Sequence, residues 1–120
     1  MKNKVSIWAG KFSSQEELES YLDFVYNDND ELSVSPFRSD YGIGHYDEDF
    51  QEAYCEDTLT DLYTLAEPLS YAESFLHLLP KDVSGINTII AIYSFAYPGE
   101  VERAGRTFFV GVYDYEYEEG

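Results

Sequence analysis

The chain has 120 residues, of which 44% are hydrophobic and 18% aromatic, and its 24 acidic against 7 basic residues give a formal net charge of −17. This size and hydrophobic content predict one folded domain over residues 1–120 and argue against bulk disorder. The charge disfavours direct binding to nucleic acid or to an anionic membrane and favours a partner with a basic surface.

The charge is concentrated in the middle of the chain, where residues 13–61 hold fifteen acidic residues against Arg38 alone. A surface that only keeps the protein soluble and a functional acidic face both fit this pattern. The start of the sequence lacks the apolar segment of a secretory signal, and Cys55 is the one cysteine. We therefore expect a cytoplasmic protein without an internal disulfide.

The first third of the chain predicts a strand, a helix and a loop. Alternating apolar residues predict a strand over 5–9. Ser14 with Glu17 three residues later is a capping box, and apolar residues at helical spacing predict an amphipathic helix over 15–26. Proline and glycines over 31–46 predict a structured loop.

The middle of the chain predicts further helices. The acids that begin segment 47–55 suit the N-terminal end of a short second helix. Segment 59–69 is ambiguous and allows a helix. Ser70 with Glu73 forms a second capping box, which predicts a helix over 70–79 that Pro80 ends.

The last third of the chain predicts two strands. Segment 87–97 is apolar on both faces, which is typical of a central strand, and 106–117 alternates as its return strand. The predicted fold class is α+β. A small, mainly antiparallel sheet is formed by the N-terminal strand and a C-terminal hairpin, and helices from the middle of the chain cover one of its faces.

The sequence offers little for catalysis or metal binding. A nucleophile needs a base, and Cys55 lies ten residues after His45; this pair stays open, but a buried thiol is the simpler interpretation. The acidic runs at 28–30 and 47–49 lack the glycine and glutamate of a calcium loop. We expect no catalytic residue, no cofactor and no specific metal site, with a weak cation site among the acids as the alternative.

Aromatic and acidic residues close together in the sequence favour a protein-binding surface instead. We expect the tyrosines to anchor a partner and the carboxylates to steer it. If the acids at 47–49 only cap a helix, the interface would move to Tyr113, Tyr115 and Tyr117. The predicted partner-binding residues are Asp28, Asp30, Glu31, Tyr41, Tyr46, Asp47, Glu48 and Asp49.

Several segments resemble a known family. Val-Ser-Ile-Trp-Ala-Gly-Lys-Phe at 5–12, Ser-Gln-Glu-Glu-Leu at 14–18, the motifs within 35–50 and Leu-Ser-Tyr-Ala-Glu-Ser-Phe at 69–75 are similar to the bacterial immunity protein 22 family. The resemblance covers most of residues 5–80. It implies a non-enzymatic protein that is encoded beside a toxin of a polymorphic toxin system and neutralises this toxin by binding, with no catalytic residue to transfer.

The resemblance and the charge together predict an immunity protein for a toxin with a basic surface. A nuclease is one such toxin, because it must bind phosphate. The alternative is an acidic DNA-mimic regulator that binds an endogenous nucleic-acid-binding protein.

Overall fold

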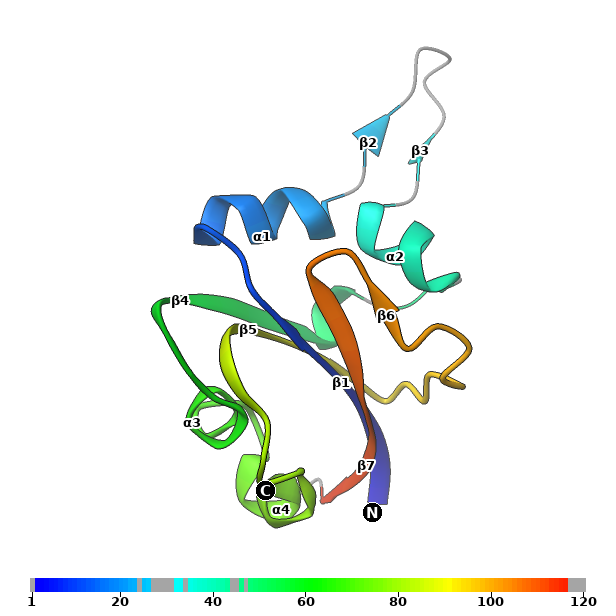
Figure 1. The fold of residues 1–120 in the computed structure, drawn as a ribbon. Coiled ribbons are helices and arrows are strands. Elements are labelled where there is room, and N and C mark those ends of the chain that lie inside the picture. Colours follow the sequence, from blue (N-terminus) through cyan, green and yellow to red (C-terminus); the bar gives the residue numbers. More distant parts are fainter. Residues whose placement is uncertain are drawn as a thin grey trace.

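The computed structural model describes residues 2–23, 25–26, 32–33, 35–43, 46 and 48–116. These residues form an α+β fold built on a five-stranded antiparallel sheet with the strand order β4-β5-β1-β7-β6 (Figure 1). The sheet strands are β1 (Lys2–Gly10), β4 (Gln51–Asp61), β5 (Ser84–Tyr93), β6 (Arg103–Ala104) and β7 (Thr107–Glu116). A separate two-stranded sheet pairs β2 (Val25–Tyr26) with β3 (Leu32–Ser33).

Helices connect these strands. The α-helices are α1 (Gln15–Leu22), α2 (Pro36–Tyr41), α3 (Leu62–Ala66) and α4 (Ala72–Phe75), and the 3₁₀ helices are η1 (Glu48–Phe50) and η2 (Leu76–Leu78).

Strand β1 occupies the middle of the sheet and pairs with two strands from the last third of the chain. Val5 lies opposite Tyr93 of β5 and also opposite Tyr113 of β7. The predicted pairing of 87–97 with 106–117 as a hairpin is therefore wrong, because β1 lies between them. Both segments are strands, and β5 has neighbours on both sides, as its apolar faces predict.

Helices cover both faces of the sheet, so the prediction of one covered face is wrong. On one face α1 and α2 pack against Trp8 and Ile90. On the other face α3 and α4 pack against Ile7 and Ile89. Neighbouring residues of β1 and β5 are thus buried in opposite directions, and Figure 1 shows α1 and α2 on one side of the sheet and α3 and α4 on the other.

The predicted cap of α1 is confirmed, and a further helix lies inside the predicted loop. The hydroxyl of Ser14 accepts a hydrogen bond from the Glu17 backbone N–H at 3.1 Å. Helix α2 begins at Pro36 after Ser35, whose hydroxyl accepts from the Arg38 N–H. It ends at Gly42, which adopts the left-handed conformation with φ of 63°.

In the middle of the chain, one predicted helix is a strand, and the helix predicted over 70–79 is present as α4 and η2 but without the predicted cap. The described part of segment 47–55, from Glu48 on, runs through η1 into β4. There Ala53 and Cys55 pack toward α1 and α2, while Tyr54 packs toward the opposite core. Ser70 does not cap a helix, because its N–H and hydroxyl both donate to the carboxylate of Glu52. Helix α4 begins two residues later, at Ala72.

Candidate functional site

The structure describes only some of the predicted partner-binding residues. Asp28, Asp30, Glu31 and Asp47 lie outside the described residues. Glu48 is the first residue of η1, and Asp49 follows it with an exposed side chain.

Tyr41 is a core residue and is not on the surface. Its side chain is 0% exposed and packs against the rings of Trp8 and Phe37. Its hydroxyl lies 2.7 Å from the Thr107 hydroxyl oxygen, and its carbonyl accepts from the Tyr97 hydroxyl. This burial corrects the expectation of an exposed anchor, because helical spacing places Tyr41 on the same inward face of α2 as Phe37.

Tyr46 is also buried. It packs against Phe95, and its hydroxyl donates to the side-chain oxygen of Gln51. Neither predicted tyrosine therefore offers its ring to a partner in this conformation.

Asp49 lines a pocket of about 380 Å³ where strands β1, β4, β5 and β7 meet the segment before α4. We call it the aromatic pocket. Its lining residues are Asn3, Asp49, Phe50, Glu52, Ser70, Tyr71, Tyr93, Ser94 and Tyr115.

Three tyrosines form the wall of the aromatic pocket. The rings of Tyr71 and Tyr115 stack at 5.4 Å between centroids with an interplanar angle of 25°. Tyr93 meets both rings edge-on, at 6.0 Å from Tyr71 and 5.1 Å from Tyr115. Tyr93 and Tyr115 are buried, whereas Tyr71 is 36% and Phe50 48% exposed, so Tyr71 and Phe50 form the open rim.

The carboxylate of Glu52 is held in place on this wall. One of its oxygens accepts from the Ser70 N–H at 2.9 Å, and the other accepts from the Ser70 hydroxyl. The Tyr93 hydroxyl lies 3.4 Å from Glu52 and donates more closely to the Ser70 carbonyl, at 2.6 Å. Burial, and then the nearby Glu52 charge, raise the pKa of Tyr93, so this phenol stays protonated at neutral pH.

Backbone strain is also found at the aromatic pocket. Among the described residues, the non-glycine residues with positive φ are Tyr71 at 60° and Ser94 at 57°, and both line the pocket. The left-handed conformation costs about 1–2 kcal/mol for such residues. Strain of this kind is frequent at functional sites, where surrounding contacts hold it in place.

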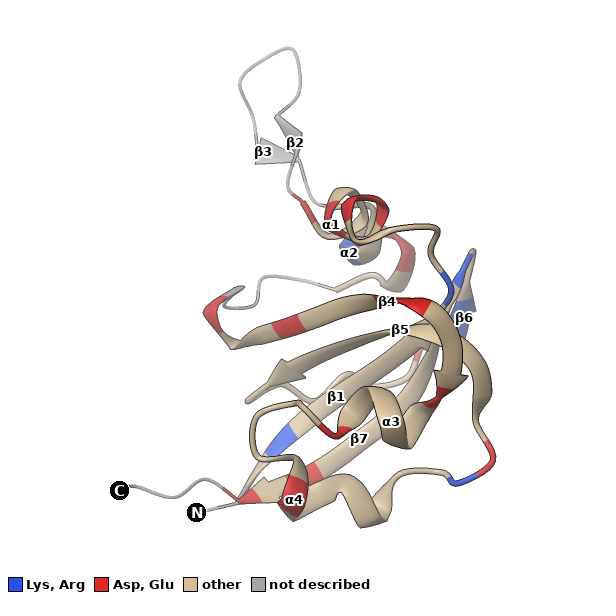
Figure 2. Ribbon diagram, turned by 90° about the vertical axis from the view of Figure 1, so that its left-hand side faces the viewer, with Lys and Arg blue, Asp and Glu red and all other residues tan. Residues whose placement is uncertain are grey.

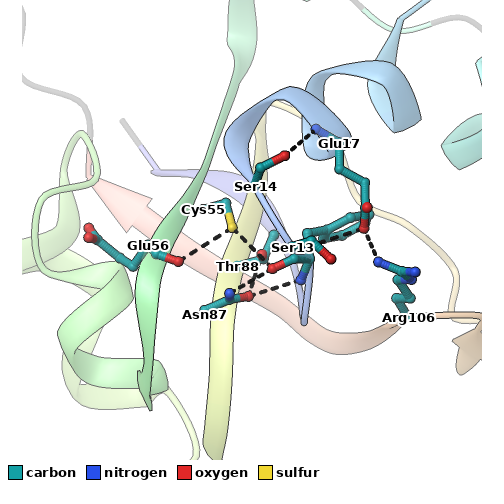
Figure 3. Close-up of polar contacts among 9 residues, drawn as sticks. Ser13, Ser14, Glu17, Cys55, Glu56, Asn87, Thr88 and Arg106 are labelled. Carbon is teal, nitrogen blue, oxygen red and sulfur yellow. Dashed lines mark hydrogen bonds and ion pairs between the residues drawn. The ribbon is translucent and has the colours of Figure 1, made fainter.

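The described residues do not bring a nucleophile to a base. The sulfur of Cys55 faces backbone carbonyls, lying 3.6 Å from that of Phe12 and 3.5 Å from that of Glu56. Figure 3 shows the contact between Cys55 and Glu56. His77 is exposed on η2, and His45, which the sequence suggested as the partner of Cys55, lies outside the described residues. Within the described part of the chain, no three His, Cys, Asp or Glu residues are placed to hold a metal ion.

Sequence reasoning missed most of the aromatic pocket. Asp49 was predicted, and Tyr115 belonged to the alternative interface, but Glu52, Tyr71 and Tyr93 were not candidates. Glu52 and Tyr93 are 41 residues apart. They meet because β4 pairs with β5, and no local spacing signals that pairing.

Acidic residues lie along helix α1 and along strand β4 (Figure 2). The structure also contains the exposed ion pairs Lys4–Asp114 and Arg106–Glu17. No helix in the described part of the chain is long and apolar enough to cross a membrane.

Comparison with known proteins identifies a family. The model of the family described as Immunity protein 22 matches residues 5–116. No curated protein and no solved structure matches the chain.

Proposed function

The chain belongs to the Immunity protein 22 family, and on that premise we propose that it covers the basic functional surface of a bacterial toxin with the surface around the aromatic pocket, whose lining includes Asp49 and Glu52. Immunity proteins neutralise toxins in general and are generally not enzymes. The proposal adds which surface binds and what kind of toxin it fits.

The aromatic pocket is the observation that supports this proposal. It places two carboxylates, Asp49 and Glu52, beside an exposed phenylalanine and three tyrosines. Aromatic residues supply most of the binding energy at protein interfaces, and fixed charges give orientation and partner choice. An aromatic pocket with two carboxylates in its lining is therefore suited to a basic protein surface.

The net charge of −17 supports a nuclease as the toxin. A nuclease presents a basic surface to phosphate, and an acidic protein occupies the same surface in place of the nucleic acid. Long-range attraction between the two charges would speed association, and salt would slow it. We place this neutralisation in the cytoplasm, where such a toxin meets its substrate.

Binding to the toxin encoded beside this chain tests the proposal. We expect the purified protein to bind that toxin, to abolish its activity at equal concentration and to restore growth of cells that produce it. Substitution of Phe50 by Ala should weaken binding by about tenfold or more, because an exposed aromatic anchor is lost.

The matched control is Leu59→Ala, which removes another exposed hydrophobic side chain, at 58% exposure, from β4 outside the aromatic pocket. It should leave the affinity unchanged. No binding of the wild-type protein to the toxin would refute the proposal. Capture of an endogenous nucleic-acid-binding protein with comparable affinity would favour the DNA-mimic alternative instead.

A further inference from the structure

We propose that β4 accepts a β-strand of the toxin along its open edge, and that this toxin strand carries lysine or arginine at alternate positions. This inference rests on the proposed function and specifies the part of the partner that binds. It is supported by the backbone groups at the edge of β4, by the groove beside this strand and by its charge.

The two edges of the five-stranded sheet differ, with β6 at one end and β4 at the other. Strand β6 has two residues, and beyond it the Glu116 N–H of β7 donates to the Ser74 hydroxyl at 3.0 Å. Strand β4 has eleven residues, and Figure 2 shows β5 beside it. Short strands, lysines and covering segments usually protect a sheet edge, but β4 is long and contains no lysine.

The hydrogen bonds of β4 indicate which backbone groups face its open edge. Cys55 donates its N–H to the side-chain oxygen of Gln15 at 2.8 Å, so this N–H points away from β5. Backbone groups alternate in direction along an antiparallel strand. The N–H and carbonyl of Ala53 therefore face the edge as well, while those of Tyr54, opposite Ile89, face β5. The described strands place none beside Ala53 on the outer side.

The bond between Cys55 and Gln15 also shows that an acceptor can approach this edge. The Gln15 oxygen lies where a carbonyl of an added strand would lie. After Cys55 the register of β4 shifts before Thr60, so the regular edge consists of residues 51–55. Strand addition at such an edge binds a partner through its main chain and selects it by alternate side chains.

A groove of about 530 Å³ lies beside this edge. It is lined by residues 51–54 and Glu56 of β4 and by Pro68 and Leu69 after α3. An added strand would hydrogen-bond through the residue opposite Ala53, and the side chains of the two neighbouring residues would point to the face of the sheet that holds Glu56 and this groove. Because Glu52, within 51–54, also lines the aromatic pocket, the groove continues the surface proposed above.

The charge of β4 selects the kind of strand. Its acidic residues are Glu52, Glu56, Asp57 and Asp61, and the sequence has no lysine or arginine between residues 39 and 80. Two β4 edges from two copies of this chain would place like charges together, which disfavours a homodimer. A strand with alternate basic residues would place opposite charges together, and this attraction requires no free hydrogen-bonding site on the carboxylates.

Amide hydrogen exchange measured by NMR tests the open edge without the toxin. In the free protein we expect the Ala53 N–H to exchange about tenfold or more faster than the Tyr54 N–H, because the Tyr54 group is bonded to β5. The two residues are neighbours in one strand, so Tyr54 is the internal control for local unfolding of β4.

A peptide probe tests strand addition. The acetylated and amidated peptide Thr-Lys-Val-Lys-Val-Lys-Thr should bind with a dissociation constant on the order of 1 mM and slow the exchange of the Ala53 N–H. With the lysines in the groove, its valines hydrogen-bond to β4 and its lysine N–H groups point away. N-methylation of both valines should therefore abolish binding, whereas N-methylation of two lysines, at the same charge, should change the affinity by less than about threefold.

Substituted proteins separate the edge from the overall charge. Glu56→Lys reverses a charge in the groove and should weaken peptide binding about fivefold or more. Glu100→Lys makes the same change at an exposed residue before β6 and should alter the affinity less than about twofold. Ala53→Pro removes the outward N–H, which edge strands tolerate, and should weaken toxin binding about tenfold or more. If Ala53→Pro fails to fold, Glu56→Lys takes its place with the toxin.

Three results would overturn the inference: equal exchange of the Ala53 and Tyr54 amides in the free protein, equal binding of the two N-methylated peptides, or equal weakening by Glu56→Lys and Glu100→Lys. A homodimer in which the Ala53 amide becomes protected would assign the edge to a second copy instead. If the toxin binds and leaves the exchange of Ala53 unchanged, strand addition is refuted while toxin neutralisation stands. If the toxin does not bind but the peptides behave as expected, only the proposed function fails.

Discussion

The side chain of Asn87 forms hydrogen bonds with the backbone of Phe12, just after the end of β1. Its side-chain oxygen accepts from the Phe12 N–H at 3.0 Å, and its side-chain nitrogen donates to the Phe12 carbonyl at 2.8 Å (Figure 3). Thr88 donates to the same oxygen at 2.9 Å. Because Phe12 is buried, its N–H depends on Asn87 for a partner, and its carbonyl would otherwise keep only the weak contact with the Cys55 thiol at 3.6 Å.

We expect Asn87→Ala to lower the free energy of unfolding by about 2 kcal/mol or more, since each unsatisfied buried polar group costs about 1–3 kcal/mol. Urea unfolding followed by Trp8 fluorescence would measure the change. Asn87→Asp, of similar shape, keeps an acceptor for the Phe12 N–H but presents no N–H donor to its carbonyl. It should destabilise at neutral pH and recover in part on acidification, when the carboxyl can donate. A loss below about 0.5 kcal/mol for Asn87→Ala would mean that water replaces the amide.

The helices begin at side chains that satisfy their first N–H groups, and these caps are features that the sequence can reveal. Ser14 caps α1, Ser35 caps α2, and Asp61 caps α3 by accepting from the Thr64 N–H at 2.7 Å. That bond lowers the pKa of the Asp61 carboxyl. Helix α4 differs, because Tyr71 precedes it in a left-handed conformation and provides no side-chain cap.

We expect Ser14→Ala to lower the free energy of unfolding by about 1 kcal/mol, the usual value of an N-cap side chain. The matched control is Ser20→Ala in the same helix, at an exposed position where alanine favours helix, and it should be neutral or slightly stabilising. Thermal unfolding of both variants would measure these changes in stability. Equal midpoints for the two variants would show that α1 depends on packing alone.

Local signals explain which elements were predictable. The strand at β1 and the start of α1 follow from alternation and from a capping box, and both are confirmed. Strand β4 was mistaken for a helix because Phe50, Ala53 and Tyr54 also fit helical spacing. Its pairing with β5, Ala53 opposite Ile90, decides the conformation instead. The aromatic pocket was predictable only at Asp49 and Tyr115, since its other groups meet through that pairing.

The charge of −17 is a property of the whole molecule. The exposed ion pairs Lys4–Asp114 and Arg106–Glu17 offset little of the repulsion that this charge causes, since surface pairs contribute about 0–1 kcal/mol each to stability. Repulsion among the remaining carboxylates favours the expanded chain. The folded state therefore has to be stabilised mainly by its two hydrophobic cores, one on each face of the sheet.

We expect the melting temperature at neutral pH to rise between low and moderate sodium chloride concentrations. Salt screens the repulsion over a Debye length of about 10 Å at 0.1 M. Salt also weakens the exposed ion pairs, but these pairs stabilise the fold by less than the repulsion destabilises it. Calorimetry across a salt series would measure the rise. A melting temperature that falls with salt would show that favourable pairs outweigh the repulsion.

The central place of β1 also determines when the sheet can form. Lys2 pairs with Glu116 and Gly10 with Thr107, so the middle strand meets one neighbour only after residue 116 has left the ribosome. Such distant pairings give a high contact order, and proteins dominated by them fold in about milliseconds to seconds. Until then the apolar side chains of Ile7 and Trp8 lie on a strand with one or both edges unpaired, a state prone to association. In the nascent chain, the acidic stretch that follows this strand would keep two such chains apart.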